Sequence, residues 1–214
     1  MITLHKSEIP PVLAENQEAW TNDLLAIIAK GEKPTKTQAN RYNQPEIKDA
    51  LKRETSGKCA YCESKPLHVS FGDIEHVSPK AIDPSKAFQW TNLTLACTVC
   101  NNAKGDTEGY IDPYVDDLFA EFEFIGPMIN HHLGRGRAEK TKVGLKLNRS
   151  ELLERRRERI DGLMDKLERL HATVDPVAKV FLKEVILNEE TADDKEYAAC
   201  TRAWVSAQQA KGHL

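Results

Sequence analysis

Two short cysteine pairs constrain this 214-residue chain more than any other feature. Cys59 and Cys62 are separated by two residues, Cys97 and Cys100 repeat that spacing, and 34 residues lie between the pairs. Together they supply four thiolates, which close a tetrahedral zinc site and leave no ligand position open for a substrate. We therefore predict a structural zinc ion, whose binding is coupled to the folding of the polar segment around it.

Composition limits where in the cell this metal site is expected and what the chain can bind through charge alone. The chain has five cysteines, and the fifth, Cys200, lies outside the two pairs. It stands in a helical pattern and is predicted to fill core space. The chain starts without the apolar segment of a secretory signal, so we expect a cytoplasmic location, where clustered cysteines more often bind metal than form disulfides. No apolar run reaches the roughly 18 residues of a membrane span. A net charge of -3 argues against coating nucleic acid through bulk charge.

The pattern along the chain predicts an α+β fold that is mostly α, in three parts. Residues 1–57 form an N-terminal helical region, 58–114 a small core with dense turns and short strands, and 115–214 a C-terminal helical region. Apolar spacing and helix-stop residues place the helices of the outer parts. They are expected from Leu13 to Ile28 with a stop at Gly31, from Pro45 toward Gly57 after a loop over 31–44, from an N-cap at Ser150 to Asp175-Pro176, over 177–188, and over 192–211.

Three polar motifs occur in order within the core. Asp73-Ile74-Glu75-His76 and Trp90-Thr91-Asn92-Leu93 lie between the cysteine pairs, and Asn101-Asn102-Ala103-Lys104-Gly105 follows the last cysteine. With the cysteines, they resemble HNH endonucleases that have a zinc-bound ββα-metal core, and the resemblance covers residues 58 to 106. These motifs and Gly144–Arg149 are also similar to the HNH subunit of Septu-type anti-phage systems. The resemblance implies a metal-dependent endonuclease that hydrolyses DNA.

The residue types suit that chemistry. Phosphodiester hydrolysis needs an activated water and a counter-charge for the transition state. His76 is suited to act as the general base because its unperturbed pKa lies near neutral pH. Glu75 and Asn101 offer hard oxygen ligands, which favour Mg²⁺ or Mn²⁺ over zinc. Asp73 shares a strand face with Glu75, so Asp73 or His68 is a further candidate for the ion shell.

Some roles come from the resemblance alone. It implies that Glu75 and His76 share one site, which requires a bulge or twist because neighbours on a strand point to opposite faces. It also implies that Asn92 holds the loop and orients the histidine ring. The chain departs from the usual pattern twice, since Glu75 stands where the family most often has Asp and Asn101 stands where it often has His. Both replacements keep an oxygen or nitrogen ligand.

Each assignment has a structural alternative. His76 could be a satisfied histidine in a zinc-ribbon adaptor that binds nucleic acid or protein without catalysis. Asn101 could instead be a helix N-cap. Lys104 could contact a phosphate or stay solvated near the end of its helix, which Gly105 is expected to cap. A stand-alone HNH nuclease of the restriction type is a further possibility for the whole chain.

The flanking regions carry charge of both signs. The basic stretch 133–149 is a candidate for contacts with DNA phosphates, with a solvated surface as the alternative. Residues 155–159 are expected to be a solvated helix face paired with neighbouring glutamates. The acidic run 112–123 should face away from DNA or meet a basic partner. The Septu resemblance implies an ABC-like ATPase that controls the nuclease as part of an anti-phage complex, and this chain has no phosphate-binding loop motif of its own.

Overall fold

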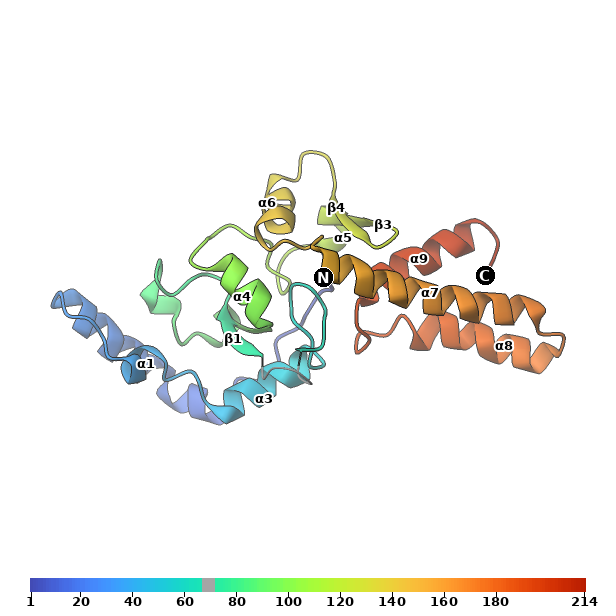
Figure 1. The fold of residues 1–214 in the computed structure, drawn as a ribbon. Helices are drawn as coiled ribbons and strands as arrows, with labels where there is room; N and C mark the ends of the chain where they lie inside the picture. The colour runs from blue at the N-terminus through green and yellow to red at the C-terminus, as the bar shows by residue number, and fades with distance from the viewer. Residues whose placement is uncertain (67–71) are drawn as a thin grey trace.

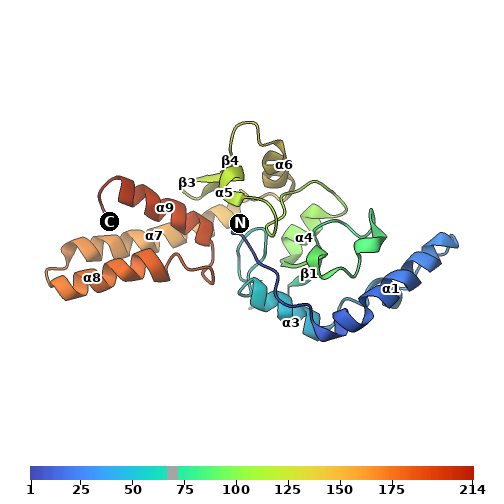
Figure 2. The ribbon, with the colours of Figure 1, turned by 180° about the vertical axis from the view of Figure 1, so that it is seen from behind.

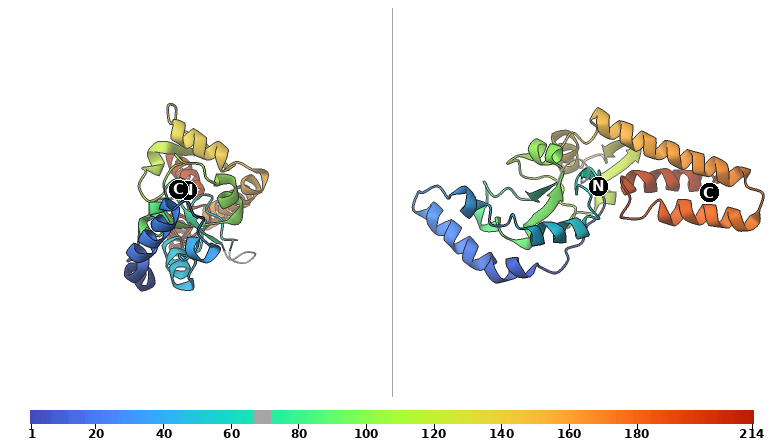
Figure 3. Two further views of the ribbon diagram at one scale, coloured as in Figure 1. Left: turned by 90° about the vertical axis from the view of Figure 1, so that its left-hand side faces the viewer. Right: turned by 60° about the horizontal axis from the view of Figure 1, so that its bottom comes forward.

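The molecule is elongated, with helices at both ends and small strands between them (Figure 1, and from behind in Figure 2). The structure, a computed structural model, describes residues 1–66 and 72–214. Helix α1 (Pro11–Ala29) lies at one end, and α7 (Ser150–Ala172), α8 (Pro176–Glu184) and α9 (Ala198–Ala210) run alongside one another at the other (Figure 3). The strands and the cysteine pairs therefore sit between two helical arms, as the mostly helical α+β prediction requires.

The N-terminal helices start and end near the predicted positions. Helix α1 has a proline in its first turn, where no backbone donor is lost, and the chain leaves it at Gly31 with a φ of 75°. Helix α3 (Pro45–Glu54) begins the same way. The segment expected to be a loop contains one more short helix, α2 (Lys36–Ala39). Its N-cap Thr35 forms a capping box with Gln38, and the loop prediction missed this pairing.

The central hairpin consists of β1 (Asp73–His76) and β2 (Leu93–Ala96), which pair antiparallel, and it is followed by α4 (Thr98–Lys104). Between the strands lie two short 3-10 turns, η2 (Pro84–Lys86) and η3 (Trp90–Asn92). The register pairs Asp73 with Ala96 and His76 with Leu93. One face of the hairpin packs its apolar side chains against α1 and α3, in a cluster that includes Leu13, Leu51, Ile74, Phe88, Leu93 and Leu95.

The alternation of side chains divides the polar residues of β1 between the two faces. Ile74 and His76 share the face that is packed against the N-terminal helices. Asp73 and Glu75 share the other face, and α4 packs against this strand. Strand β1 pairs residue for residue with β2 through His76, so the ladder contains no bulge at the Glu75–His76 step that would place both side chains on one face.

A second hairpin lies in the region predicted to be helical. It consists of β3 (Phe122–Ile125) and β4 (Met128–His131), with the short helix α5 (Leu118–Glu121) before it and α6 (Gly136–Gly144) after it. Gly126 makes the turn with a φ of 58°, a conformation that costs glycine little. The acidic composition of this segment hid the alternation of Phe122 and Phe124 with polar residues.

The C-terminal arm forms where long apolar stripes were predicted. Arg149, and not Ser150, is the N-cap of α7, so the helix begins at Ser150. Helix α8 continues into a π-helical segment, η4 (Val185–Glu189). The last helix starts at Ala198, later than predicted, because Tyr197 has a left-handed backbone with a φ of 56°. The arm is held together by a cluster of Leu167, Leu170, Ile186 and Val205.

The buried side chain of Arg156 joins this arm to the second hairpin. Its Nη1 donates to the carbonyls of Leu147 and Pro127 at 2.9 and 3.2 Å, and its guanidinium lies over the ring of Phe124. The helix face expected to be solvated therefore carries a buried structural arginine, and Arg159 of the same face pairs with Glu190 beyond α8. Arg155 pairs on the surface with Glu158, three residues along. In the part of the chain that the structure describes, no helix is both long and apolar enough to cross a membrane.

Candidate functional site: a four-cysteine metal centre beside a polar strand and helix

The four cysteines of the two pairs converge on one buried point. Their sulfur atoms all lie within 4.8 Å of one another, and the Sγ atoms of Cys62 and Cys97 are 3.8 Å apart. A zinc–sulfur bond of about 2.3 Å gives a tetrahedron whose sulfur–sulfur edges are about 3.8 Å, so the cage has the size that zinc needs. Across residues 1–66 and 72–214, no other group of three or more His, Cys, Asp or Glu ligands could share an ion.

Local backbone contacts place the cysteines. Cys97 is the N-cap of α4, where its sulfur accepts a hydrogen bond from the backbone N–H of Cys100 at 3.4 Å. In the first pair, the N–H of Cys59 donates to the carbonyl of Ser64, and the N–H of Ala60 donates to that of Leu95 in β2. The metal centre thus joins the loop after α3, the second strand and the start of α4. Four thiolates would complete the coordination of a zinc ion and leave no open position, so an ion bound here would be structural.

Arg149 lies against this cage from the C-terminal arm. Its Nη1 is 3.8 Å from the sulfur of Cys100, and the thiol groups of Cys100 and Cys62 raise the pKa of the guanidinium against the opposing effect of burial. A zinc ion with four thiolates carries two net negative charges, and a guanidinium beside it reduces that charge. Arg149 is the last residue of the Gly144–Arg149 segment, which the sequence singled out without a role.

A pair of contacts links α4 to the polar face of β1. The side-chain amide of Asn101 donates to Asp73 Oδ2 at 3.0 Å. One turn later, Lys104 Nζ lies 2.9 Å from Glu75 Oε1 and donates to the main-chain carbonyl of His76 at 2.8 Å. The spacing of three residues on the helix matches the spacing of two on the strand, so both side-chain pairs form on one shared face.

These contacts decide between the alternative roles that the sequence allows for residues of α4. Asn101 is in the second turn and does not cap the helix, which is the role of Cys97. Gly105 is the C-cap with a φ of 50°, as expected. Lys104 is neither solvated nor free for a phosphate, because it is 1% exposed and paired with Glu75. The sequence offered no sign of this pairing, since a lysine at the end of a helix is usually exposed.

Glu75 is a buried carboxylate, with 6% of its surface exposed. Burial raises its pKa because the charged form loses water, while the ammonium of Lys104 acts against that rise. Asp73 adds a second negative charge nearby, which raises the pKa further. The face therefore holds two acidic groups and an amide oxygen with one cation. Hard oxygen donors of this kind fit Mg²⁺ or Mn²⁺.

His76 is buried on the opposite face at the end of β1. Its Nε2 lies 2.9 Å from the carbonyl oxygen of Ala87, and because a carbonyl only accepts, the proton is on Nε2. Nδ1 therefore carries the lone pair, and it is not among the fully buried atoms without a partner. Burial, with smaller effects of Lys80 and Lys104, lowers the pKa of His76 to about 4. The imidazole is thus neutral at pH 7, the form that accepts a proton.

Asn92 closes the loop that separates the two strands. Its Oδ1 accepts from the N–H of Ser78 at 2.7 Å, and its Nδ2 donates to the carbonyls of Ser78 and Lys86 at 3.0 and 3.1 Å. The bond to Lys86 fixes the segment whose next residue, Ala87, holds the imidazole. Asn92 makes contacts of the kind that the sequence resemblance implies, and it acts on His76 through the backbone.

The remaining predicted residues have separate positions. His68 lies outside the described residues. Cys200 is buried in the same apolar cluster as the cage but is not one of its four sulfurs, and its thiol donates to the carbonyl of Gly126. Two residues near the site were missed by the sequence, namely Lys104 as an ion-pair partner and Tyr42, whose ring contacts the His76 imidazole. Tyr42 comes from the segment read as a loop, which carries no metal or catalytic motif.

Several basic side chains of the stretch 133–149 already have partners within the chain. Arg137 forms two 2.9 Å contacts with the carboxylate of Asp116, and Arg135 lies 3.4 Å from Glu121. Lys140 donates to the backbone carbonyl of Glu108. The acidic run that was expected to meet a basic partner therefore meets one in its own chain, and fewer of these cations are available for DNA phosphates.

Comparison with known proteins agrees with this geometry. Residues 59–107 match the family model described as HNH endonuclease. The chain is similar to a Septu protein PtuB of Bacillus thuringiensis, with 33% identity over 76 residues, which cover 35% of this chain and 30% of that protein. It is also similar to a Septu protein PtuB of Bacillus mycoides (strain KBAB4), with 28% identity over 159 residues, which cover 58% of this chain and 54% of that protein.

The matches therefore span about half or less of the length of these curated relatives. The family match starts at the first cysteine of the cage and ends just after the Lys104–Gly105 step, so it contains both cysteine pairs, the hairpin and α4. On the combined evidence of the cysteine cage, the ββα arrangement and this match, the chain carries an HNH endonuclease domain in residues 59–107, with PtuB proteins of Septu systems among its relatives.

Proposed function

We propose that this chain is a metal-dependent endonuclease that hydrolyses phosphodiester bonds in DNA. The observation that carries the proposal is the neutral imidazole of His76, fixed through Nε2 at the end of the strand that also supplies Asp73 and Glu75. None of the five cysteines is paired in a disulfide, which suits the reducing cytoplasm in which we propose that the enzyme acts.

In this mechanism the lone pair on Nδ1 of His76 takes a proton from water. The water oxygen bonds to phosphorus, the bond from phosphorus to the leaving oxygen breaks, and that oxygen takes a proton from solvent. The carbonyl of Ala87 keeps the other ring nitrogen protonated, so the imidazole presents its basic nitrogen in one orientation. Asn92 supports this step by fixing the loop that ends at Ala87.

Asp73, Glu75 and Asn101 would hold the divalent ion on the face of β1 opposite His76, so a phosphate that meets both the ion and Nδ1 would have to lie past the end of the strand, where His76 is the last residue. When bound, Mg²⁺ or Mn²⁺ supplies positive charge to the transition state and to the leaving oxygen. Lys104 balances part of the negative charge of Glu75 and acts against the rise in its pKa that burial causes. Only one oxygen of Glu75 contacts Lys104, and the second is left for a metal.

Plasmid cleavage tests this proposal. The purified protein, alone and with the proposed ATPase partner, should cut plasmid DNA with Mg²⁺ or Mn²⁺ and stop when EDTA removes the ion. Glu75→Gln should lower the cleavage rate at least about tenfold, since a catalytic ion stabilises the transition state by several kcal/mol. Glu154→Gln, at an exposed position of α7, is the matched control and should keep the wild-type rate. DNA binding without cleavage under all these conditions would favour the adaptor alternative.

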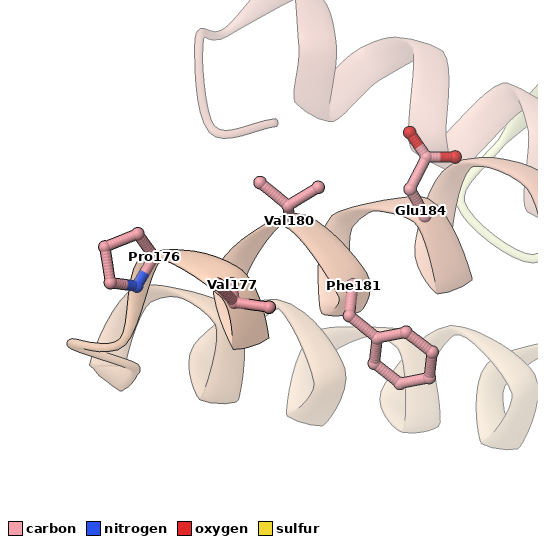
Figure 4. A pocket seen from close by; sticks show the side chains of 5 residues that line it. All are labelled: Pro176, Val177, Val180, Phe181 and Glu184. Atoms are coloured by element: carbon pink, nitrogen blue, oxygen red, sulfur yellow. The ribbon is translucent and has the colours of Figure 1, made fainter.

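We further propose that an ABC-like ATPase controls this nuclease within an anti-phage defence complex. The name of the PtuB relatives and an exposed apolar face on α8 support this. Val177, Val180 and Phe181 project from that face, and Phe181 is 63% exposed (Figure 4). Contiguous apolar side chains on a surface are a common mark of a protein-binding site.

Co-purification with an ABC-like ATPase of a Septu-type system tests the partner. Phe181→Asp should abolish capture, because a buried carboxylate in an apolar interface is strongly unfavourable. Phe119→Asp is the matched control, since Phe119 is a still more exposed phenylalanine on α5. If both variants were captured equally well, α8 would not be part of the interface with the ATPase. No capture of the wild-type protein would count against the partner itself.

A further inference from the structure

The imidazole of His76 has a second neighbour that lies outside the matched domain. Tyr42, in the turn between α2 and α3, contacts the ring of His76 edge to face, with ring centroids 4.6 Å apart and an interplanar angle of 88°. The tyrosine ring also packs near Phe88, with centroids 6.4 Å apart. Residues 59–107 therefore do not contain every side chain that touches the proposed base.

The HNH loop itself holds this turn in place. Lys80, four residues after His76, donates to the carbonyl of Ala39 at 3.1 Å, to Asn40 Oδ1 at 2.8 Å and to the hydroxyl of Tyr42 at 2.9 Å. Its ammonium also lies 4.6 Å from the centroid of the Tyr42 ring. One lysine thus anchors the turn at three atoms, all within four residues of each other.

Tyr42 is not a competing base. Burial, with additional effects of the Glu75 and Asp73 carboxylates, raises its pKa to about 12, so the phenol stays protonated at neutral pH.

We propose that Tyr42 is a positioning residue that fixes the imidazole of His76 for proton transfer, an inference that rests on the proposed nuclease function. The Nε2 bond to Ala87 fixes one point of the ring and leaves rotation about that bond free. The edge-to-face contact with Tyr42 fixes the plane of the ring. Together the two contacts direct Nδ1 to one place, which a general base needs because small displacements cost much of the rate.

The test compares Tyr42→Leu with Tyr42→Phe. Leucine removes the ring, so kcat for plasmid cleavage should fall on the order of 10-fold to 100-fold with KM nearly unchanged. Phenylalanine keeps the ring and loses only the hydroxyl, so it should restore kcat to within about threefold of wild type if ring contact is what matters. Zinc content and thermal unfolding temperature establish that both variants are folded. Equal kcat for the leucine variant and wild type, or a rise in kcat, would overturn the proposal.

A spectroscopic measurement separates this inference from the proposed function. The Tyr42 ring should shift the ring-proton resonances of His76 in NMR spectra of the zinc-loaded protein, and that shift should persist in Tyr42→Phe and disappear in Tyr42→Leu. If wild type cuts no DNA, the nuclease proposal fails while the NMR result still reports on the contact. If wild type cuts DNA and the His76 resonances do not respond to Tyr42→Leu, the nuclease stands and the positioning role is wrong.

Discussion

Replacing His76 with alanine should lower the rate of DNA cleavage by roughly 10²-fold to 10⁴-fold, the usual contribution of a positioned general base. Alanine removes the imidazole at the end of β1, which burial keeps neutral and a backbone carbonyl orients. The loop should survive the change, because Asn92 fixes it through three bonds that do not involve the imidazole. Cleavage of supercoiled plasmid, measured with Mg²⁺ and the partner present, gives the rate.

His171→Ala is the matched control for that experiment. His171 lies on α7, far along the C-terminal arm, and bonds only to the backbone carbonyl of His213 among the described residues. It should cut at the wild-type rate. Cutting by the His76 variant at the wild-type rate, with an intact zinc site, would remove His76 from the mechanism and leave the acidic face of β1 without a base.

Replacing Cys59 with serine should empty the zinc site and unfold the domain around it. The cage is buried within an apolar cluster and joins the loop after α3, strand β2 and α4, so loss of the ion would leave four buried thiols and release these three segments from one another. Zinc binding in such sites contributes on the order of 10 kcal/mol, more than the whole stability of most small domains. The measurements are zinc content by mass spectrometry, circular dichroism and thermal unfolding, with one zinc expected in wild type and none in the variant.

Cys200→Ser provides the control for the loss of a thiol. Cys200 is equally buried but lies outside the cage, and a serine hydroxyl can keep the bond to the carbonyl of Gly126. This variant should retain full zinc content and lose only a little stability. A Cys59 variant that still bound one zinc and melted at the wild-type temperature would contradict the structural role of the ion.

The metal cage was predictable because a two-residue spacing between cysteines has few other uses in a reducing compartment. The helices with long apolar stripes were predictable for a similar reason, since periodicity repeats over many residues. The hairpin β3–β4 was not, because each strand has only four residues and lies in an acidic segment. A short alternating pattern is easily lost where charged residues from neighbouring turns interrupt it.

In the candidate site, too, the sequence predicted some features and missed others. His76, Asn92 and Asn101 stood in ordered motifs, so their proximity to the cysteines followed from the chain. The partners of these residues did not, because Lys104 and Tyr42 act through contacts that form only when α4 and the N-terminal turn pack against β1. Sequence patterns report which residues are present on an element, and tertiary packing decides which side chain each of them meets.

The contact of Arg149 with the cage has a mechanical consequence. Helix α7 begins directly after this arginine and has 23 residues, which makes it a rod about 35 Å long. The near end of the rod rests on the sulfur of Cys100, in the first turn of the helix that carries Asn101 and Lys104. A force applied near the α7–α8 corner would therefore be transmitted to the sulfur of Cys100, and through it to the helix that contacts Asp73 and Glu75.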